Sequence, residues 1–576
     1  MLEFRKDLFA DERDDNLNEI GKSSQRQDAL GHVTGRSPFF DDHKVDGLLH
    51  LKMVRSPHAH ARIRSIDTSA AERMPGVHRI LRAADVPVNL NALLSLLNFG
   101  LDDEPSLAVD KVKYVGEPVV AVVAESEIQA YDAVAQVRVD YEEMPAIFEV
   151  EEAIKPGAIV VNETYPTNKF IYHEKYDHQK IRFGDVDSAF AQADHVLEAR
   201  YSMSPIEHAP VEPNGCIVVP ETNDRYGVYT ATQGLFFSLG TAAKILDMPS
   251  NKLHFMGGTV GAGFGGKVDS MVEPMAVLAC KLIGRPVRYC FNRQEEMQVG
   301  APRGAEIIYV KDGVMNDGRL VARQINNYFD AGAYTRLSSY AVIKCAGHMP
   351  GPYTIPNVAS NTYCVYTNRT PSTAMRGFGI TAVDYAIECH MDKMANLVGM
   401  DPMEFRILNS YRDGDMKAHR REAKNCAMIE CVQVAAEKVN WPIRPEFKAM
   451  SSMKDGGGPR ATIPHTVTDN NGAVGGAAPA QSGYQPMQPV QPMTPPPSAP
   501  QYSPPPPPAA PQYTPPPPPP AYTAPPPPPP PPPAPPASAN APAQPGDQSS
   551  RAQSQRPGFA RHGANRFSSV TGTRRR

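Results

Sequence analysis

Proline divides this chain into a part that can build a core and a part that cannot. More than half of its 60 prolines lie beyond Ser451, and Ser503–Pro536 consists largely of proline runs. No charged residue occurs between Asp469 and Asp547. Such a sequence lacks the apolar side chains that a core needs and favours extended polyproline II. We therefore expect a globular region followed by a disordered, proline-rich tail over residues 451–576, whose end is basic.

Charge and cysteine usage narrow the class of protein. The formal net charge is -4 and the pI is near 6.5, which does not favour nucleic acid as a partner. The eight cysteines include no CxxC pair, so we expect free thiols and a reducing compartment. Residues 1–25 form a polar arm without the apolar segment of a secretory signal, and no apolar run reaches the roughly 18 residues of a membrane span. These features predict a cytoplasmic protein without a membrane span.

Strand and helix patterns alternate along the globular region, which predicts a mixed α/β or α+β fold. Residues 26–150 predict a compact α/β domain, residues 151–182 a connection, and residues 183–445 a second α/β region. Val119–Val123 is a continuous apolar run, typical of a strand buried on both faces. Further strands are expected at Leu48–Val54, Ala61–Ile66, Val137–Tyr141, His195–Ser202, Gly215–Val219, Gly227–Ala231, Lys252–Met256, Val287–Phe291, Ala305–Val310 and Gly318–Ala331, and helices at Ala70–Met74, Glu127–Gln136, Asp187–Ala193, Phe236–Leu246, Ser270–Leu282 and Thr381–Leu397.

The segment Gly257–Lys267, GGTVGAGFGGK, carries the strongest chemical signal. Glycine has no Cβ, so backbone N–H groups in such a segment can crowd around an anion. A strand before it and a helix after it would place the segment at the positive end of a helix. A tight structural turn without a ligand is the plainer interpretation.

Two general phosphate-binding patterns fit this segment incompletely. Gly261–Lys267 has the P-loop spacing GxxxxGK, but Val268 stands where magnesium needs Ser or Thr. The same glycines fit the dinucleotide pattern GxGxxG, but Arg288 and Arg293 lie where an acidic ribose ligand is wanted. A nicotinamide-dependent dehydrogenase therefore stays open as an alternative.

Three segments together resemble the molybdenum hydroxylases, the family of xanthine dehydrogenase, aldehyde oxidase and nicotinate dehydrogenase. The glycine segment resembles the loop that sets main-chain amides against the pterin, which implies that role for Gly263 and Gly265, with the Phe264 ring closing the pocket. Ala231-Thr232-Gln233-Gly234 resembles a turn whose glutamine donates to a molybdenum oxo ligand, which implies Gln233. TNRTPSTAMRGFG, ending at Gly379, resembles the segment whose arginine, here Arg376, contacts the cofactor.

A fourth segment, HAPVEPNG from His208 to Gly215, resembles the family's H-x-x-x-E-P sequence. Its histidine and Glu212 have the spacing of a metal pair on a helix, but Pro210 and Pro213 would break that helix. We expect this segment to support the cofactor site from below.

The resemblance implies an α/β hammerhead domain over residues 26–150 and the first half of a molybdopterin-binding domain over residues 183–445. It implies hydroxylation with oxygen from water and a molybdenum–molybdopterin cofactor, in the cytosine dinucleotide form, whose metal is held by the pterin. The second half of the family's large subunit carries the catalytic glutamate, so the resemblance places that residue on a second molybdopterin subunit. Electrons would pass to a [2Fe-2S] subunit and an FAD subunit.

Three positions bear on the substrate. Val268 stands where xanthine dehydrogenase has a substrate glutamate, Lys344 stands where it has a substrate arginine, and Phe378 aligns with an aromatic residue that stacks on flat substrates. The resemblance thus implies an N-heteroaromatic compound or an aldehyde rather than a purine. A non-catalytic interaction protein, formed by a degraded hydroxylase half with a proline-rich docking arm, is the other alternative.

Overall fold

The structure is a computed structural model that describes residues 25–91, 93–97 and 100–456. The described residues fall within a single compact unit of the chain. The arm expected over residues 1–25 and the tail expected over residues 451–576 lie outside the described residues, except for Gln25 and residues 451–456.

A seven-stranded sheet combines strands from both halves of the described chain. β1 (Leu49–Arg55) pairs in parallel with β12 (Val287–Cys290) and antiparallel with β5 (Pro118–Ala124). β5 is buried at every position after its first, as expected for its apolar run. The strand order is β11-β10-β9-β12-β1-β5-β3, with β11 (Leu253–Gly257), β10 (Arg225–Thr230), β9 (Gly215–Glu221) and β3 (Val77–Leu81).

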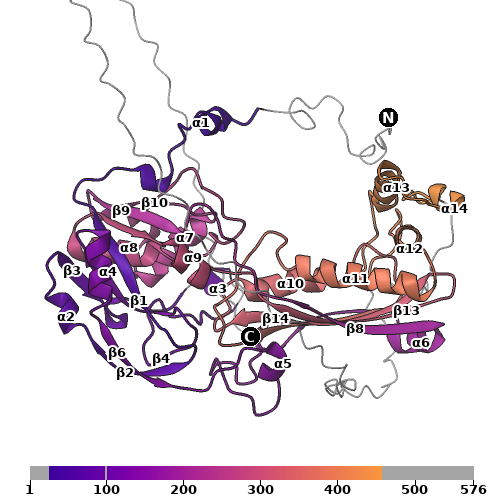
Figure 1. Cartoon of the computed structure of the whole chain (residues 1–576), viewed down its shortest axis with the longest axis horizontal. Helices are drawn as coiled ribbons and strands as arrows, with labels where there is room; N and C mark the ends of the chain where they lie inside the picture. Colours follow the sequence, from indigo (N-terminus) through magenta and orange to yellow (C-terminus); the bar gives the residue numbers. More distant parts are fainter. Residues whose placement is uncertain (1–24, 92, 98–99, 457–576) are drawn as a thin grey trace, which may run out of the picture. The chain divides into compact units, whose positions relative to one another are not determined.

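Helices α7 (Leu235–Ile245) and α8 (Glu273–Ile283) pack on this sheet next to β9, β10 and β11 (Figure 1). α8 has proline in its first turn, buries eight of its residues and ends at Gly284, whose φ of 75° is left-handed. The helix expected after the glycine segment is present, but it begins three residues later than expected. The segment ends at Lys267, whereas α8 begins only at Glu273.

A second sheet has five strands. Its order is β7-β15-β14-β13-β8, and α10 (Ser338–His348) and α11 (Thr381–Leu397) lie along it (Figure 1). The five strands are β7 (Gln179–Phe183), β15 (Val358–Tyr366), β14 (Leu320–Gly332), β13 (Glu306–Val314) and β8 (His195–Met203).

A three-stranded sheet in the order β4-β2-β6 and several short helices complete the described fold. Its strands are β4 (Lys111–Val112), β2 (Ala61–Asp67) and β6 (Arg138–Glu143). The remaining helices are α1 (Ala29–Val33), η2 (Phe40–Asp42), α2 (Ser69–Glu72), η3 (Ala83–Asp85), α3 (Leu93–Leu96), α4 (Glu127–Val134), α5 (Val150–Ala153), α6 (Val186–Gln192), η4 (Ser250–Lys252), α9 (Arg293–Val299), α12 (Pro402–Asn409), α13 (Met428–Lys438) and α14 (Pro445–Lys448).

The strands and helices expected from the sequence are present, with ends shifted by a few residues. All eight cysteines fall within the described residues; they are free, and five of them are buried. No helix in the described part of the chain is both long and apolar enough to span a bilayer.

Candidate functional site

A buried ion pair holds the glycine segment from its inner side. The carboxylate of Glu212 accepts hydrogen bonds from the ammonium of Lys267 and from the backbone N–H of Gly261, at 2.8 and 2.7 Å. The Glu212 N–H donates in turn to the Gly261 carbonyl at 3.0 Å. The Lys267 side chain is fully buried. The middle of the segment, at Gly261, and its end, at Lys267, are therefore tied to one carboxylate.

This contact removes Lys267 as a phosphate ligand. In a P-loop the lysine must reach the bound phosphates, whereas here its ammonium is buried and bonded to Glu212. The P-loop interpretation of Gly261–Lys267 is therefore wrong.

Gln233 closes the segment from the side. Its Oε1 accepts from the backbone N–H of Gly265 at 2.8 Å and of Lys267 at 3.3 Å. The backbone N–H of Gln233 donates to the Lys267 carbonyl at 2.7 Å. A Cβ at Gly263 would lie 2.3 Å from Gln233 Oε1, so only glycine fits there without displacing the glutamine. Because the oxygen faces the segment, the Nε2 group of this exposed side chain is left for another partner.

The segment that carries Arg376 packs against the same loop. The Arg376 N–H donates to the Phe264 carbonyl at 2.7 Å. A Cβ at Gly265 would lie 2.6 Å from the Ala374 carbonyl oxygen, so the two backbones are in direct contact. His208 Nε2 lies 2.9 Å from the same Ala374 oxygen and must donate to it, because a carbonyl can only accept. Burial lowers the pKa of His208, which favours the neutral ring.

Upstream, this segment is anchored to the first part of the chain. The Asn368 side chain accepts from the Ile147 N–H and donates to the Lys113 carbonyl, both at 2.9 Å. Thr367 donates to the buried Asp330 at 2.7 Å. The turn between Asn368 and Arg376 is therefore held at its start by these contacts and at its end by the hydrogen bond of Arg376 to Phe264.

The outer surface of the loop presents unpaired donors. Ala262, Phe264 and Gly265 have φ values of 76°, 53° and 106°, which curl the backbone. Within residues 25–91, 93–97 and 100–456, the N–H groups of Gly263 and Phe264 have no hydrogen-bond acceptor, and the Arg376 guanidinium has no partner. The Phe264 ring is 47% exposed. The surface is therefore a cradle of donors suited to an anionic or oxo-bearing group.

The expected substrate positions fall into two places. The Phe378 ring lies 5.7 Å from that of Tyr340, and Lys344 Nζ lies 5.0 Å from the same tyrosine ring. Tyr340 therefore lies between Phe378 and Lys344, and the sequence did not indicate it. Its spacing of four from Lys344 would have revealed it once α10 was recognised. Val268 lies instead beside the Gln233 turn, because its carbonyl faces Gly234.

Just past the loop, Asp269 lines a small polar cavity of about 60 Å³ together with Arg336 and Glu104, which form an ion pair. The Asp269 side chain is buried, and neither of its carboxylate oxygens has a hydrogen-bond partner among the described residues. Burial raises the pKa of Asp269 to about 6, although Arg336 acts in the opposite direction. The carboxylate is therefore costly to keep ionised.

Replacing Asp269 with asparagine is expected to stabilise the fold at pH 8 and not at pH 4. The folded protein keeps a proton that the unfolded chain releases near pH 4, so stability falls as the pH rises to about 6 and is flat above it. Removing that loss should raise the free energy of unfolding at pH 8 by about 3 kcal/mol. Urea unfolding at both pH values tests this. An equal effect at both would contradict it.

Comparisons with known proteins identify the family to which the chain belongs. The "Molybdopterin cofactor-binding domain" family matches residues 166–410, and the "Aldehyde oxidase and xanthine dehydrogenase, a/b hammerhead domain" matches residues 34–145. The nicotinate dehydrogenase large molybdopterin subunit of Eubacterium barkeri is 32% identical over 422 residues, which cover 73% of this chain and 96% of that protein. The chain belongs to the xanthine dehydrogenase and aldehyde oxidase family of molybdopterin-binding subunits.

Other members of the family are longer. The nicotine 6-hydroxylase large subunit of Paenarthrobacter nicotinovorans is 34% identical over 435 residues, which cover 74% of this chain and 52% of that protein. The aldehyde oxidoreductase structure from Desulfovibrio gigas superposes with a TM-score of 0.67 at 29% identity, over 74% of this chain and 48% of that one. The chain therefore spans about half the length of these two relatives.

Proposed function

We propose that this chain is the molybdopterin-binding subunit of a multi-subunit molybdenum hydroxylase that oxidises an N-heteroaromatic compound or an aldehyde with water as the oxygen source. The observation that carries the proposal is the convergence of Gln233, the Gly263–Gly265 backbone and Arg376, from three distant parts of the chain, on one surface.

The residues present fit the cofactor. Glycine at position 263 leaves room for the Gln233 side chain to lie against the loop, next to the unpaired N–H groups of Gly263 and Phe264. This set of donors suits a group with oxo and pterin oxygens. When bound, the molybdenum–molybdopterin group supplies the two-electron oxidation chemistry. Gln233 Nε2, the Gly263 and Phe264 N–H groups and the Arg376 guanidinium would hold it. Gly265, expected as a further N–H donor to the cofactor, instead shapes the loop through Gln233.

The other residues of the site act by keeping these donors in place. Glu212 and Lys267 fix the loop ends, and neutral His208 fixes the Ala374 carbonyl behind the loop. Preorganised donors of this kind stabilise negative charge without rearranging during the reaction. The Phe264 ring, which is exposed, is proposed to close the pocket against a partner surface.

A second molybdopterin subunit is proposed to carry the catalytic glutamate, with a [2Fe-2S] subunit and an FAD subunit as electron acceptors, in a cytoplasmic complex. The support is that the Eubacterium barkeri relative, named a large molybdopterin subunit, matches this chain over 96% of its length. The cytosine dinucleotide form of the pterin is part of the same proposal.

Lys344, Phe378 and Val268 are proposed to shape the substrate pocket. The cation of Lys344 and the ring of Phe378 lie against the same tyrosine ring, so a flat substrate with a carboxylate could stack and pair there. Apolar Val268 lies next to the Gln233 turn, where it is proposed to contribute an apolar wall.

The test is metal analysis and turnover with the complex purified through this chain. We expect about one molybdenum per chain, a cytosine nucleotide released on acid treatment, and turnover of nicotinate or benzaldehyde in preference to hypoxanthine. Absence of molybdenum would overturn the cofactor assignment. Inactivity on all three compounds, with molybdenum present, would overturn the substrate class alone.

A further inference from the structure

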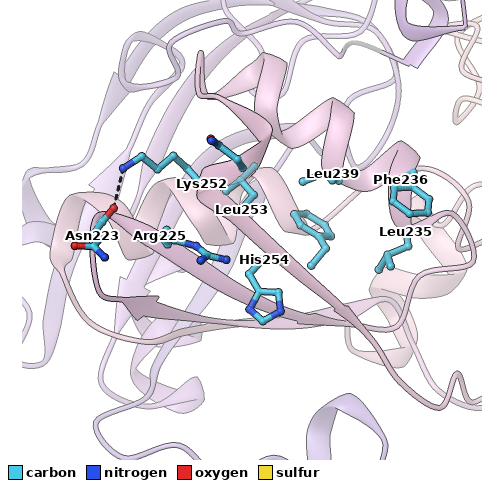
Figure 2. A pocket seen from close by; sticks show the side chains of 10 residues that line it. Asn223, Arg225, Leu235, Phe236, Leu239, Lys252, Leu253 and His254 are labelled. Atoms are coloured by element: carbon cyan, nitrogen blue, oxygen red, sulfur yellow. Dashed lines mark hydrogen bonds between the residues drawn. The ribbon is translucent and has the colours of Figure 1, made fainter. Parts of the chain in front are cut away.

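A large groove runs along the free edge of the seven-stranded sheet. Its volume is about 610 Å³, and it lies between β11, the first residues of α7 and the β9–β10 turn (Figure 2). In the described part of the chain, β11 pairs on one side only, with β10. One wall of the groove is therefore the unpaired edge of β11.

The residues of β11 meet the groove along their backbone. Three consecutive residues of the strand, Leu253 to Phe255, line it, together with Asn251 and Lys252 of the preceding helix η4. Side chains of a strand alternate between the two faces of a sheet, so a groove that touches successive residues runs along the edge, where N–H and C=O groups are free. The β10–β11 register is continuous over five residue pairs, and β11 contains no proline, so nothing blunts this edge.

The side chains around the edge give it two different ends. Figure 2 shows Leu235, Phe236 and Leu239 of α7 at one end. Phe236 is 81% exposed, which is costly for so large an apolar side chain unless a partner covers it.

The other end of the groove is basic. Arg225, Lys252 and His254 lie there, and the one carboxylate that pairs with two of them is that of Glu221. The residues that line the groove include Arg225 and Lys252 but no carboxylate, since Glu221 and Asp224 lie outside the lining. An occupant that carries a carboxylate at this end would pair with these two cations.

We propose that this groove, the β11 edge, is the docking site for an extended segment of a partner polypeptide that adds a strand to the sheet. Its backbone would pair with β11, an apolar side chain would cover Phe236, and an acidic side chain would meet Arg225 and Lys252. The site is continuous with the cofactor surface, because β11 runs directly into the glycine segment and Leu235 follows Gly234 in the Gln233 turn. The proposal rests on the proposed function only in taking the partner to be the second molybdopterin subunit.

Hydrogen exchange and site-directed cross-linking of the native complex test the docking site. Amides of residues 253–257 should exchange at least about tenfold more slowly in the complex than in the full chain alone. A benzophenone side chain introduced at Phe236 should cross-link to an extended, acidic segment of the partner. Cross-links to a second copy of this chain, or to its own residues 457–576, would overturn the proposal, as would unchanged exchange.

Charge reversal supplies the matched variants. Arg225→Glu with Lys252→Glu should weaken assembly at least tenfold, whereas Arg79→Glu on β3, the opposite edge of the same sheet, should not. Phe236→Asp should also weaken assembly. Its control is Ile128→Asp, which changes another exposed apolar side chain and should leave assembly unchanged. Equal effects of test and control variants would overturn the docking site. Molybdenum measured in the same wild-type samples reports separately on the proposed function, since a partner that docks on a metal-free chain would leave the docking site intact.

Discussion

Replacing Glu212 with leucine is expected to lower the free energy of unfolding by about 3 to 5 kcal/mol, because it removes the carboxylate that is hydrogen-bonded to the buried Lys267 ammonium and leaves only the charge of Glu296 opposite it. The Lys267 side chain has no exposed surface, and among the described residues its ammonium is hydrogen-bonded to Glu212 alone. Burial already lowers the pKa of Lys267, so the unpaired lysine should also lose its proton more readily. Urea unfolding of the purified chain, followed by the fluorescence of Trp441, its one tryptophan, measures the change.

The double variant Glu212→Leu with Lys267→Met is the control. Apolar side chains of similar volume often replace a buried pair without loss of stability, so most of the lost free energy should return. The Gly261 N–H would still lack its acceptor, and the loop end would stay loose. We therefore expect molybdenum content to remain low in the double variant. Recovery of both stability and metal would show that Glu212 serves only to neutralise Lys267.

The sequence carried enough information to find the segments of the site but not the contacts between them. Gln233, Phe264 and Arg376 could be singled out because each lies in a segment that resembles a motif of the molybdenum hydroxylases. Their convergence depends on hydrogen bonds between residues far apart in the chain, such as Gln233 with Gly265 and Arg376 with Phe264. Periodicity and turn signals are local, so they cannot supply such pairings. The roles of these residues toward the cofactor stay predictions.

Lys267 shows how a local pattern can mislead. Its place at the end of GxxxxGK fits a phosphate ligand, but the partner that buries it, Glu212, comes from a segment 55 residues earlier. Only the fold shows that this lysine points inward. The same holds for β1 and β12, whose parallel pairing joins positions more than 200 residues apart.

Two elements next to the site, β15 and α10, were not predicted because their own sequences lack the usual strand and helix signals. β15 carries buried Ser360, Asn361 and Thr362 at its centre, so it shows neither the alternation nor the apolar run of a typical strand. α10 begins after Leu337 without a side-chain cap, so it has no start signal. α10 carries both Tyr340 and Lys344 and packs against β15, so without these two elements the neighbourhood of Tyr340 and Lys344 could not be recognised from the sequence.

Replacing Gly263 with alanine is expected to reduce molybdenum content at least tenfold with little effect on folding. Its Cβ would lie 2.3 Å from Gln233 Oε1, which is the far end of a flexible side chain, so the glutamine can swing away for about 1 kcal/mol. That movement releases the N–H groups of Gly265 and Lys267 and withdraws Nε2 from the cradle. Metal analysis and urea unfolding of the same preparation separate the two effects.

Gly265→Ala is the matched variant. It should lower both the molybdenum content and the free energy of unfolding. Its φ of 106° is unfavourable for any side chain, and its Cβ would meet the Ala374 backbone at 2.6 Å, which cannot swing away. We expect a loss of about 3 kcal/mol or more in stability together with the metal. If Gly263→Ala retained full molybdenum while Gly265→Ala lost it only through unfolding, the loop would be a structural turn, and the donors on its surface would have no cofactor to hold.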